Sequence, residues 1–276
     1  MNTEQQVATH YTHGSLQQAI LDALKQMGKD PERFTAMDLS TGDEFHLGWL
    51  PATAALAKDL GLAPGMHVLD VGCGIGGPAR YFAEAHKCCV TGIDLTEEFV
   101  QVAMELTRRC GLADLVAFRH GSALDLPFDD ASFDAATLIH VGMNISDKAR
   151  LFEEARRVLR PGALFCVYEV MRAGEGNLPY PMPWAQSTET SFVEAPETYR
   201  RLLSAAGFRI EREENRRAFV LDLAREMRAK IERDGLPALN PHVLIGPAAR
   251  ERLGNVMATL ERGTIAPVEM VARVVS

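Results

Sequence analysis

The chain has 276 residues, which is long enough for one α/β domain with an insertion and a sizeable buried core. Hydrophobic residues make up 47% and charged residues 24%, as in ordinary soluble globular proteins. The formal charge of −8 and the lack of a basic block argue against a nucleic-acid substrate, whose phosphates require a positive surface. We also expect no membrane contact, because no stretch approaches the length of an apolar span.

The five cysteines stand at irregular positions and form no C-x-x-C pair: Cys73, Cys88, Cys89, Cys110 and Cys166. Reduced thiols are the simplest reading of that pattern. The first residues also lack the positively charged, apolar leader of a secreted protein. We therefore expect a cytoplasmic protein.

From residue 67 to 160, short apolar runs alternate with amphipathic segments. This alternation predicts a doubly wound α/β fold with a parallel sheet. Strands are expected at 68–71, 89–94, 115–120, 133–139 and 163–170, and helices at 78–86, 97–109 and 147–159, the last stopped by Pro161-Gly162. Further along, a helix at 196–206 precedes strands at 208–214 and 264–275.

A glycine-rich turn follows the first strand, in the stretch from His67 to Pro78. Gly72, Gly74 and Gly77 have G-x-G-x-x-G spacing, and Asp94 follows about 20 residues later at the end of the second strand. Residues without a Cβ let backbone amides approach a ligand, and the helix behind the turn adds partial positive charge. Such a turn can also be purely structural, but the order of strand, loop, helix, strand and acid favours a cofactor site.

Asp70 stands inside the first strand, two residues before the first glycine. A carboxylate there is unsuited to the pyrophosphate of a dinucleotide, which such helix ends otherwise hold. It suits a ligand that carries a positive charge and an amino group. The acid therefore favours a cationic cofactor over a nicotinamide dinucleotide.

The segment Leu69-Asp70-Val71-Gly72-Cys73-Gly74-Ile75-Gly76 resembles the first motif of class I S-adenosylmethionine-dependent methyltransferases. The resemblance covers roughly residues 45–215. It implies a seven-stranded, mostly parallel, Rossmann-like sheet with an antiparallel last strand. It also implies S-adenosylmethionine as methyl donor, S-adenosylhomocysteine as product, and no metal. The implied cofactor residues are Asp70, Gly72, Cys73, Gly74, Gly76, Asp94, Leu95, Ser122, Ala123, Leu124 and His140.

Within that set the resemblance gives individual roles. Asp94 would bind the ribose hydroxyls, although it could equally be a plain strand-terminal acid, and Leu95 would pack on adenine. Relatives usually carry Asp where this chain has Ser122, which weakens a role for that side chain. The backbone amide of Ala123 can still read the adenine edge.

We divide the chain into three regions. Residues 1–50, with a helix at 15–27 and a turn at 43–49, form an N-terminal helical lid that folds over the cofactor in related enzymes. Residues 51–217 and 264–276 form the core. Residues 218–263 form a helical cap insertion, with helices at 218–234 and 247–262 and a loop at 235–246. The alternative is an extra helical layer packed away from the site.

His140, at the end of the fourth strand, is the leading catalytic candidate, because histidine titrates near neutrality and can take a proton from an acceptor. Its surroundings resemble phosphoethanolamine methyltransferases, in which a matching histidine pairs with an N-terminal tyrosine. Tyr11 is the candidate partner, and His46 is the second candidate base. Alternatively, His140 only packs on the cofactor or orients the substrate, and His46 is structural.

Acceptor contacts are expected from the loop after strand four and from the Pro-rich segment 177–196. Aromatic rings there could hold a cationic amine, stack on a planar ring, or simply anchor the segment. The candidates are Trp49, Met143, Asn144, Tyr180, Trp184 and Phe192.

Two other chemistries are disfavoured. Asn177-Leu-Pro-Tyr180 looks like the tetrapeptide of amino-group methyltransferases, but it follows strand five instead of strand four and lacks the second-position proline. Metal-dependent catechol methylation needs clustered ligands, and only Asn144 and Asp147 are near.

The pattern also resembles sarcosine/dimethylglycine N-methyltransferases and quinone-type C-methyltransferases, through Phe45-His46, residues 140–144 and 180–184. We expect a monomer or homodimer that N-methylates a small amine. The alternative is O- or C-methylation of a phenolic or quinone-like metabolite. A nicotinamide-dependent oxidoreductase and a binding module without turnover are the rivals from other classes.

Overall fold

The computed structural model describes residues 2–12 and 14–275. Its centre is a seven-stranded sheet with the strand order β3-β2-β1-β4-β5-β7-β6. β7 runs antiparallel to β5 and β6, and the other pairs are parallel, so the expected sheet is confirmed. The strands are β1 (His67–Val71), β2 (Cys89–Asp94), β3 (Val116–His120), β4 (Phe133–Ile139), β5 (Leu159–Arg172), β6 (Phe208–Asn215) and β7 (Ile265–Val274).

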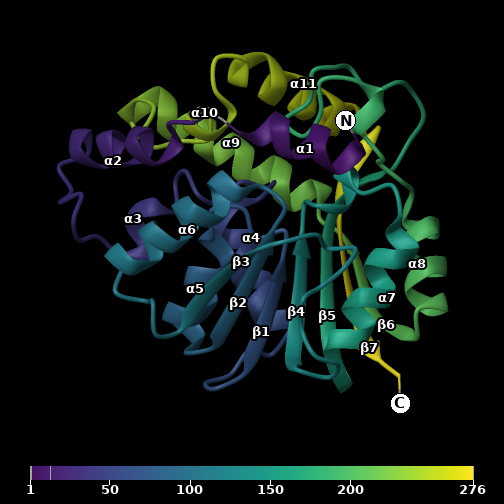
Figure 1. Ribbon diagram of the computed structural model, residues 1–276. Coiled ribbons are helices and arrows are strands. Elements are labelled where there is room, and N and C mark those ends of the chain that lie inside the picture. The colour runs from purple at the N-terminus through teal and green to yellow at the C-terminus, as the bar shows by residue number, and fades with distance from the viewer. Residues whose placement is uncertain (1, 13, 276) are drawn as a thin grey trace.

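Helices cover both faces of the sheet (Figure 1). α4 (Trp49–Asp59), α5 (Gly77–His86) and α6 (Glu97–Arg109) pack on one face, and α7 (Lys148–Val158) and α8 (Pro196–Ala205) on the other. In α6 the buried residues Phe99, Val102, Ala103 and Leu106 recur at helical spacing, which gives the helix one apolar face for the core.

A further layer crosses the sheet at the carboxyl ends of the parallel strands (Figure 1). It combines α1 (Thr3–Tyr11) and α2 (Leu16–Gln26) with α9 (Arg217–Asp234), α10 (His242–Ile245) and α11 (Ala249–Arg262), whereas the short α3 (Ala36–Leu39) packs on α5. The two chain regions meet there, since α10 packs on α2. Residues far apart in sequence therefore cover one end of the sheet.

Most predicted boundaries agree with the structure within two residues, but several details differ. Residues 235–246 were expected to be a loop, and they contain α10. α7 ends at Val158, and Pro161-Gly162 lies inside β5 instead of ending the helix. α1, α3 and α4 were not predicted; α1 is mostly polar, and Val7 is its one buried residue.

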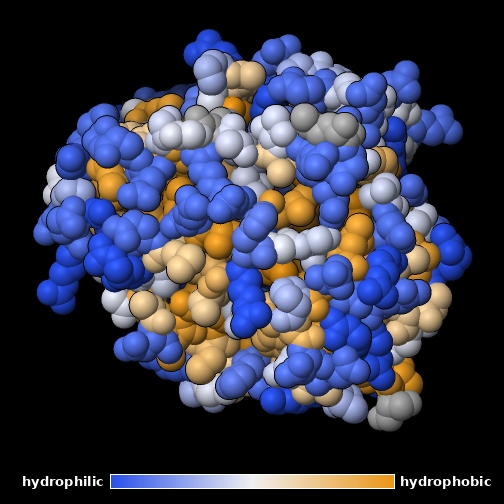
Figure 2. Space-filling view, in the orientation of Figure 1, coloured by the Kyte–Doolittle hydropathy of each residue, from blue (hydrophilic) through white to orange (hydrophobic). Residues whose placement is uncertain are grey.

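Among the described residues, no helix combines the length and apolar character required to cross a bilayer. On the face shown in Figure 2, apolar side chains appear between polar ones in the central region, below the helical layer. The division into lid, core and cap remains a prediction, as do the cytoplasmic location and the oligomeric state.

Candidate active site

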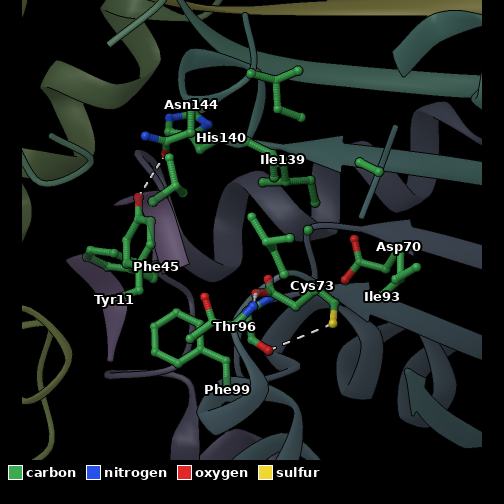
Figure 3. Close-up of a pocket in the computed structure, with 18 of the residues that line it drawn as sticks. Tyr11, Phe45, Asp70, Cys73, Ile93, Thr96, Phe99, Ile139, His140 and Asn144 are labelled. Atoms are coloured by element: carbon green, nitrogen blue, oxygen red, sulfur yellow. Dashed lines mark hydrogen bonds between the residues drawn. The ribbon is translucent and has the colours of Figure 1, made fainter. Parts of the chain in front are cut away.

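A cavity lies under α1 at the carboxyl ends of β1, β2 and β4. The strand order reverses between β1 and β4, which is where doubly wound sheets bind ligands. Asp70 and Cys73 lie across this cavity from Tyr11 and Phe45 (Figure 3). Nine of the predicted cofactor residues line it: Asp70, Gly72, Cys73, Gly74, Asp94, Leu95, Ala123, Leu124 and His140.

The Asp70 carboxylate is 1% exposed and has one unpartnered oxygen. Oδ1 accepts a hydrogen bond from the Thr137 hydroxyl at 2.7 Å, whereas Oδ2 has no partner in the described part of the chain. Burial raises the pKa of this carboxyl to about 7, because the charged form has lost its water. An ammonium group in the cavity would satisfy Oδ2 and favour the ionised form. This site is therefore suited to a cationic ligand.

The glycine turn brings main-chain groups to the cavity wall. Gly72 has a φ of +72°, and a Cβ there would lie 2.3 Å from a methyl carbon of Val141, so only glycine fits. Gly74 has open space where a Cβ would point, and its N–H donates to Asp94 Oδ2 at 2.9 Å. Thr96 N–H donates to Asp94 Oδ1 at 2.8 Å. These bonds hold the Asp94 carboxylate at the edge where ribose hydroxyls could reach it.

Two predicted cofactor residues lie outside the lining. Gly76 is the N-cap of α5, and a Cβ there would lie 2.5 Å from the ring of Phe118, so its role is packing behind the turn. The Ser122 hydroxyl donates to the carboxylate of Glu4 and accepts from Leu124 N–H. Ser122 therefore ties α1 to the loop after β3 instead of facing the ligand.

A second cavity of about 470 Å³ adjoins the first. The two share Tyr11, Phe45, His46 and His140 in their walls. Helices α9 and α11 form much of the second wall, which is mainly apolar and includes Met143, Val170, Trp184, Met227, Ile231, Leu253, Val256 and Met257. Of the predicted acceptor residues, Trp49, Met143 and Trp184 line this cavity.

The remaining acceptor candidates lie elsewhere. Tyr180 packs partly buried in the cluster beneath α11 and lines neither cavity. Phe192 is also outside both, and its backbone donates to the Met143 carbonyl at 2.7 Å and accepts from Lys148 Nζ. The Tyr180 ring therefore packs in this cluster, and main-chain hydrogen bonds hold Phe192 in place.

His140 lies in the wall between the cavities, with both ring nitrogens engaged by the main chain. Leu47 N–H donates to Nε2 at 3.3 Å, so Nδ1 must carry the proton that it donates to the Tyr168 carbonyl at 3.0 Å. Burial, and next the charge of His46, lower the pKa of the ring to about 3. In this arrangement His140 is a neutral ring that positions the loop after β4.

His46 is buried nearby within a network of side chains. Its Nε2 lies 2.8 Å from Glu44 Oε2 and 3.0 Å from the Thr53 hydroxyl, which itself donates to Glu44 at 2.6 Å. The His46 and His140 rings are 5.9 Å apart between centroids. Glu44 and Thr53 were absent from the predicted site, because nothing local in the sequence marks a threonine on α4 as the partner of a loop carboxylate.

The expected pairing of Tyr11 with His140 is not present. The Tyr11 hydroxyl donates to Asn144 Oδ1 at 3.0 Å, as the dashed line in Figure 3 shows. The amide nitrogen of Asn144 donates to the carbonyls of Trp184 and Thr190. Asn144 therefore joins α1 to the segment after β5, and Tyr11 closes the boundary between the two cavities.

Comparison with known proteins gives a consistent assignment. Residues 69–167 match a methyltransferase domain model. A sterol 24-C-methyltransferase of Gibberella zeae is 42% identical over 114 residues, which is 41% of this chain but 30% of that protein. The matched part therefore spans about a third of that relative's length, so the likeness concerns the domain.

Solved structures resemble the fold over nearly the whole chain. The [4+2]-cyclase SpnF is 26% identical with a TM-score of 0.67 and covers 99% of this chain and 97% of its own. A Haemonchus contortus phosphoethanolamine N-methyltransferase, in complex with S-adenosyl-L-methionine, has a TM-score of 0.72 at 24% identity and covers 93% of this chain and 60% of its own. The second likeness concerns the fold alone.

These findings agree with the geometry of the first cavity, where Asp70 and Asp94 flank a glycine turn. They leave no support for the nicotinamide alternative. Residues 69–167 carry a methyltransferase domain of the class I, S-adenosylmethionine-dependent type.

Proposed function

We propose that this protein transfers a methyl group from S-adenosylmethionine to a hydroxyl or carbon of a large, mainly apolar small molecule. The observation that carries the proposal is the second cavity. It is apolar, has a volume of about 470 Å³, and shares a wall with the cavity that holds Asp70. Volumes of this order are typical of sites for ligands of drug size.

On the cofactor side, the proposal assigns each contact to a residue of this chain. The unpartnered oxygen of Asp70 would accept from the cofactor's amino group, and Asp94 from its ribose hydroxyls. Leu95 and Phe99, which line the same cavity, would hold the adenine between them. When bound, the cofactor supplies an activated methyl group on a sulfonium centre, so the protein must chiefly align a nucleophile behind it.

On the acceptor side, the cavity disfavours the small amine that the sequence analysis preferred. A molecule such as sarcosine would leave most of the space unfilled and would meet mainly apolar walls. The sterol substrate named for the curated relative is of the larger, apolar kind.

Methyl transfer itself needs a direct test, because a shared fold does not determine the reaction. The protein is incubated with radiolabelled S-adenosylmethionine and a panel of acceptors: cholesterol, 4-nonylphenol and other apolar phenols, sarcosine and ethanolamine. We expect label in apolar products. Label confined to the small amines, or cofactor binding without transfer to any acceptor, would contradict the proposal.

A cavity-filling variant tests the location of the acceptor. Met257→Trp places a larger ring in the wall of the apolar cavity, so turnover of the apolar acceptor should fall by about 100-fold or more while the affinity for S-adenosylhomocysteine stays within about twofold. Met104→Trp is the matched control, because Met104 is 55% exposed on α6 and lines neither cavity. Equal turnover by both variants would place the acceptor elsewhere.

A further inference from the structure

We infer that the carboxylate of Glu4, on the helix that covers the cofactor cavity, accepts a hydrogen bond from the exocyclic amino group of adenine. Ser122 is the positioning residue that holds this carboxylate in place. The inference rests on the proposed function through the methyl donor alone, since the donor and its demethylated product carry the same base. It makes α1 a part of the protein that distinguishes adenine from other purines.

One face of α1 forms a wall of the cofactor cavity. Glu4, Val7 and Tyr11 line the cavity, and their spacing of three and four residues places them on one side of the helix. Both ends of this face are hydrogen-bonded to loops that follow strands, Tyr11 to Asn144 and Glu4 to Ser122. α1 therefore adds a carboxylate to the cavity wall at a defined place.

Ser122 fixes the orientation of the Glu4 carboxylate. The Ser122 hydroxyl accepts the Leu124 N–H at 3.0 Å and donates its own proton to Glu4 Oε1. Asp125 is the acid of the same loop, but it is exposed and lines neither cavity. The loop after β3 therefore presents an acid from α1 to the cavity instead of one of its own.

The second carboxylate oxygen of Glu4 is available to a ligand. Within residues 2–12 and 14–275, Oε2 accepts no hydrogen bond, and no lysine or arginine lines the cofactor cavity to pair with it. Glu4 is half-buried, so its carboxylate has lost part of its water. A donor on the ligand would replace that water, which favours a ligand with an amino group at this point.

The groups beside Glu4 complement the edge of adenine. That edge presents an amino group, which donates, next to the ring nitrogen N1, which accepts. Ala123 lines the cavity, and its N–H makes no hydrogen bond in the described part of the chain, so it can donate to N1. Glu4, bonded to the adjacent residue, then supplies the acceptor for the amino group. Leu95 and Phe99 lie in the same wall, where they would cover the faces of the ring.

The test measures binding and needs no methyl acceptor. Calorimetry compares S-adenosylhomocysteine with its deamino analogue, in which hydrogen replaces the amino group at C6 of the purine. The wild type should prefer S-adenosylhomocysteine by about 10–100-fold, because the analogue lacks the hydrogen bond to a charged group. Glu4→Ala should reduce this preference to within about threefold, by weakening the binding of S-adenosylhomocysteine and not that of the analogue.

Two further variants sharpen the assignment. Glu4→Gln keeps an oxygen that can accept but removes the charge, so it should retain an intermediate preference of about three- to tenfold. Ser122→Ala removes the hydrogen bond that orients Glu4 and should also lower the preference, by about three- to tenfold. Glu97→Gln is the matched control, because Glu97 is an exposed acid in the first turn of α6 that lines neither cavity. It should keep the wild-type preference.

A purely structural role for Glu4, in which it only fastens α1 to the loop after β3, gives a different result. Glu4→Ala would then weaken both ligands by the same factor and leave the preference for the amino group unchanged. That outcome would overturn the inference. A wild-type preference below about threefold would also overturn it, because no protein group would then bind the amino group.

The results also separate this inference from the proposed function. If S-adenosylhomocysteine binds without a preference that depends on Glu4, the inference fails, and methyl transfer to apolar acceptors is unaffected. If the preference depends on Glu4 but no acceptor is methylated, the proposed function fails and the role of Glu4 stands.

Discussion

The two cavities of this protein are built in different ways. The cofactor cavity lies under α1 and is walled in large part by short segments that directly follow β1, β2, β3 and β4, which bring the carboxylates of Asp70 and Asp94 to it. The acceptor cavity is walled largely by residues outside the sheet, from the loop after α3 and from α9 and α11, and is mainly apolar. Recognition of charge is thus built into the strand ends, whereas space for the acceptor is created by helices packed over them.

Breaking the contact between α5 and the loop before α4 is expected to give the largest change in the free energy of unfolding. Arg80 on α5 is fully buried and donates to Asp43 at 2.8 Å, which attaches the loop before α4 to the helix behind the glycine turn. Arg80→Leu should lower the free energy of unfolding by about 3–5 kcal/mol, because it leaves the Asp43 carboxylate buried without its partner. Urea denaturation measures this change.

Arg108→Leu is the control for that variant. Arg108 also pairs with an acid, Glu105, but its side chain is 60% exposed, and exposed pairs contribute about 0–1 kcal/mol. If Arg80→Leu changed stability no more than this control, the two regions would not be joined by the buried pair.

Asp70→Asn tests the charge of the cofactor cavity. Removing the carboxylate charge should weaken binding of S-adenosylhomocysteine by about 10–100-fold at pH 8, since a charged hydrogen bond contributes about 1.5–3 kcal/mol. Calorimetry measures the affinity, and Asp114→Asn, on an exposed loop, is the control. Unchanged affinity would show that the cofactor's amino group binds elsewhere.

The carboxyl group of Asp70 should also make the affinity for S-adenosylhomocysteine depend on pH. The ionised carboxylate binds the ammonium group, so affinity should fall as the pH drops below about 7, by at most tenfold per unit, and Asp70→Asn should remove this dependence.

In the ligand-free protein, the raised pKa of Asp70 destabilises the fold at high pH, because unfolding lets the acid ionise. Asp70→Asn should therefore be the more stable form at pH 8, by up to about 4 kcal/mol, with the difference vanishing below about pH 4.

Tyr11→Phe should give the smallest effect. It removes the hydrogen bond from α1 to Asn144 at the boundary of the two cavities, which contributes about 1 kcal/mol. Hydrogen exchange should show faster opening of α1, and affinity for S-adenosylhomocysteine should fall by about two- to fivefold. Tyr81→Phe on α5, outside both cavities, should leave both measurements unchanged. A larger loss of turnover than of affinity would indicate a chemical role for the Tyr11 hydroxyl.

The parts of the site that could be predicted are those that follow strands. β2, β4 and α6 have the expected bounds, because alternating apolar runs and helix caps are local features. The glycine turn was recognisable for the same reason. By contrast, Tyr180 and Phe192 were assigned to the acceptor from residue type alone, and neither lines the cavity.

The amino-acid sequence by itself determined the doubly wound sheet, the glycine turn and the acids at its edge, since each depends on residues only a few positions apart. Tertiary structure alone decided the states of the two histidines. His140 receives an N–H from Leu47, 93 positions away, and donates to Tyr168, 28 positions away. His46 faces Glu44 and Thr53, brought together by the turn into α4. The available lone pair of a buried imidazole depends on which donors and acceptors surround it, and residue spacing does not contain that information.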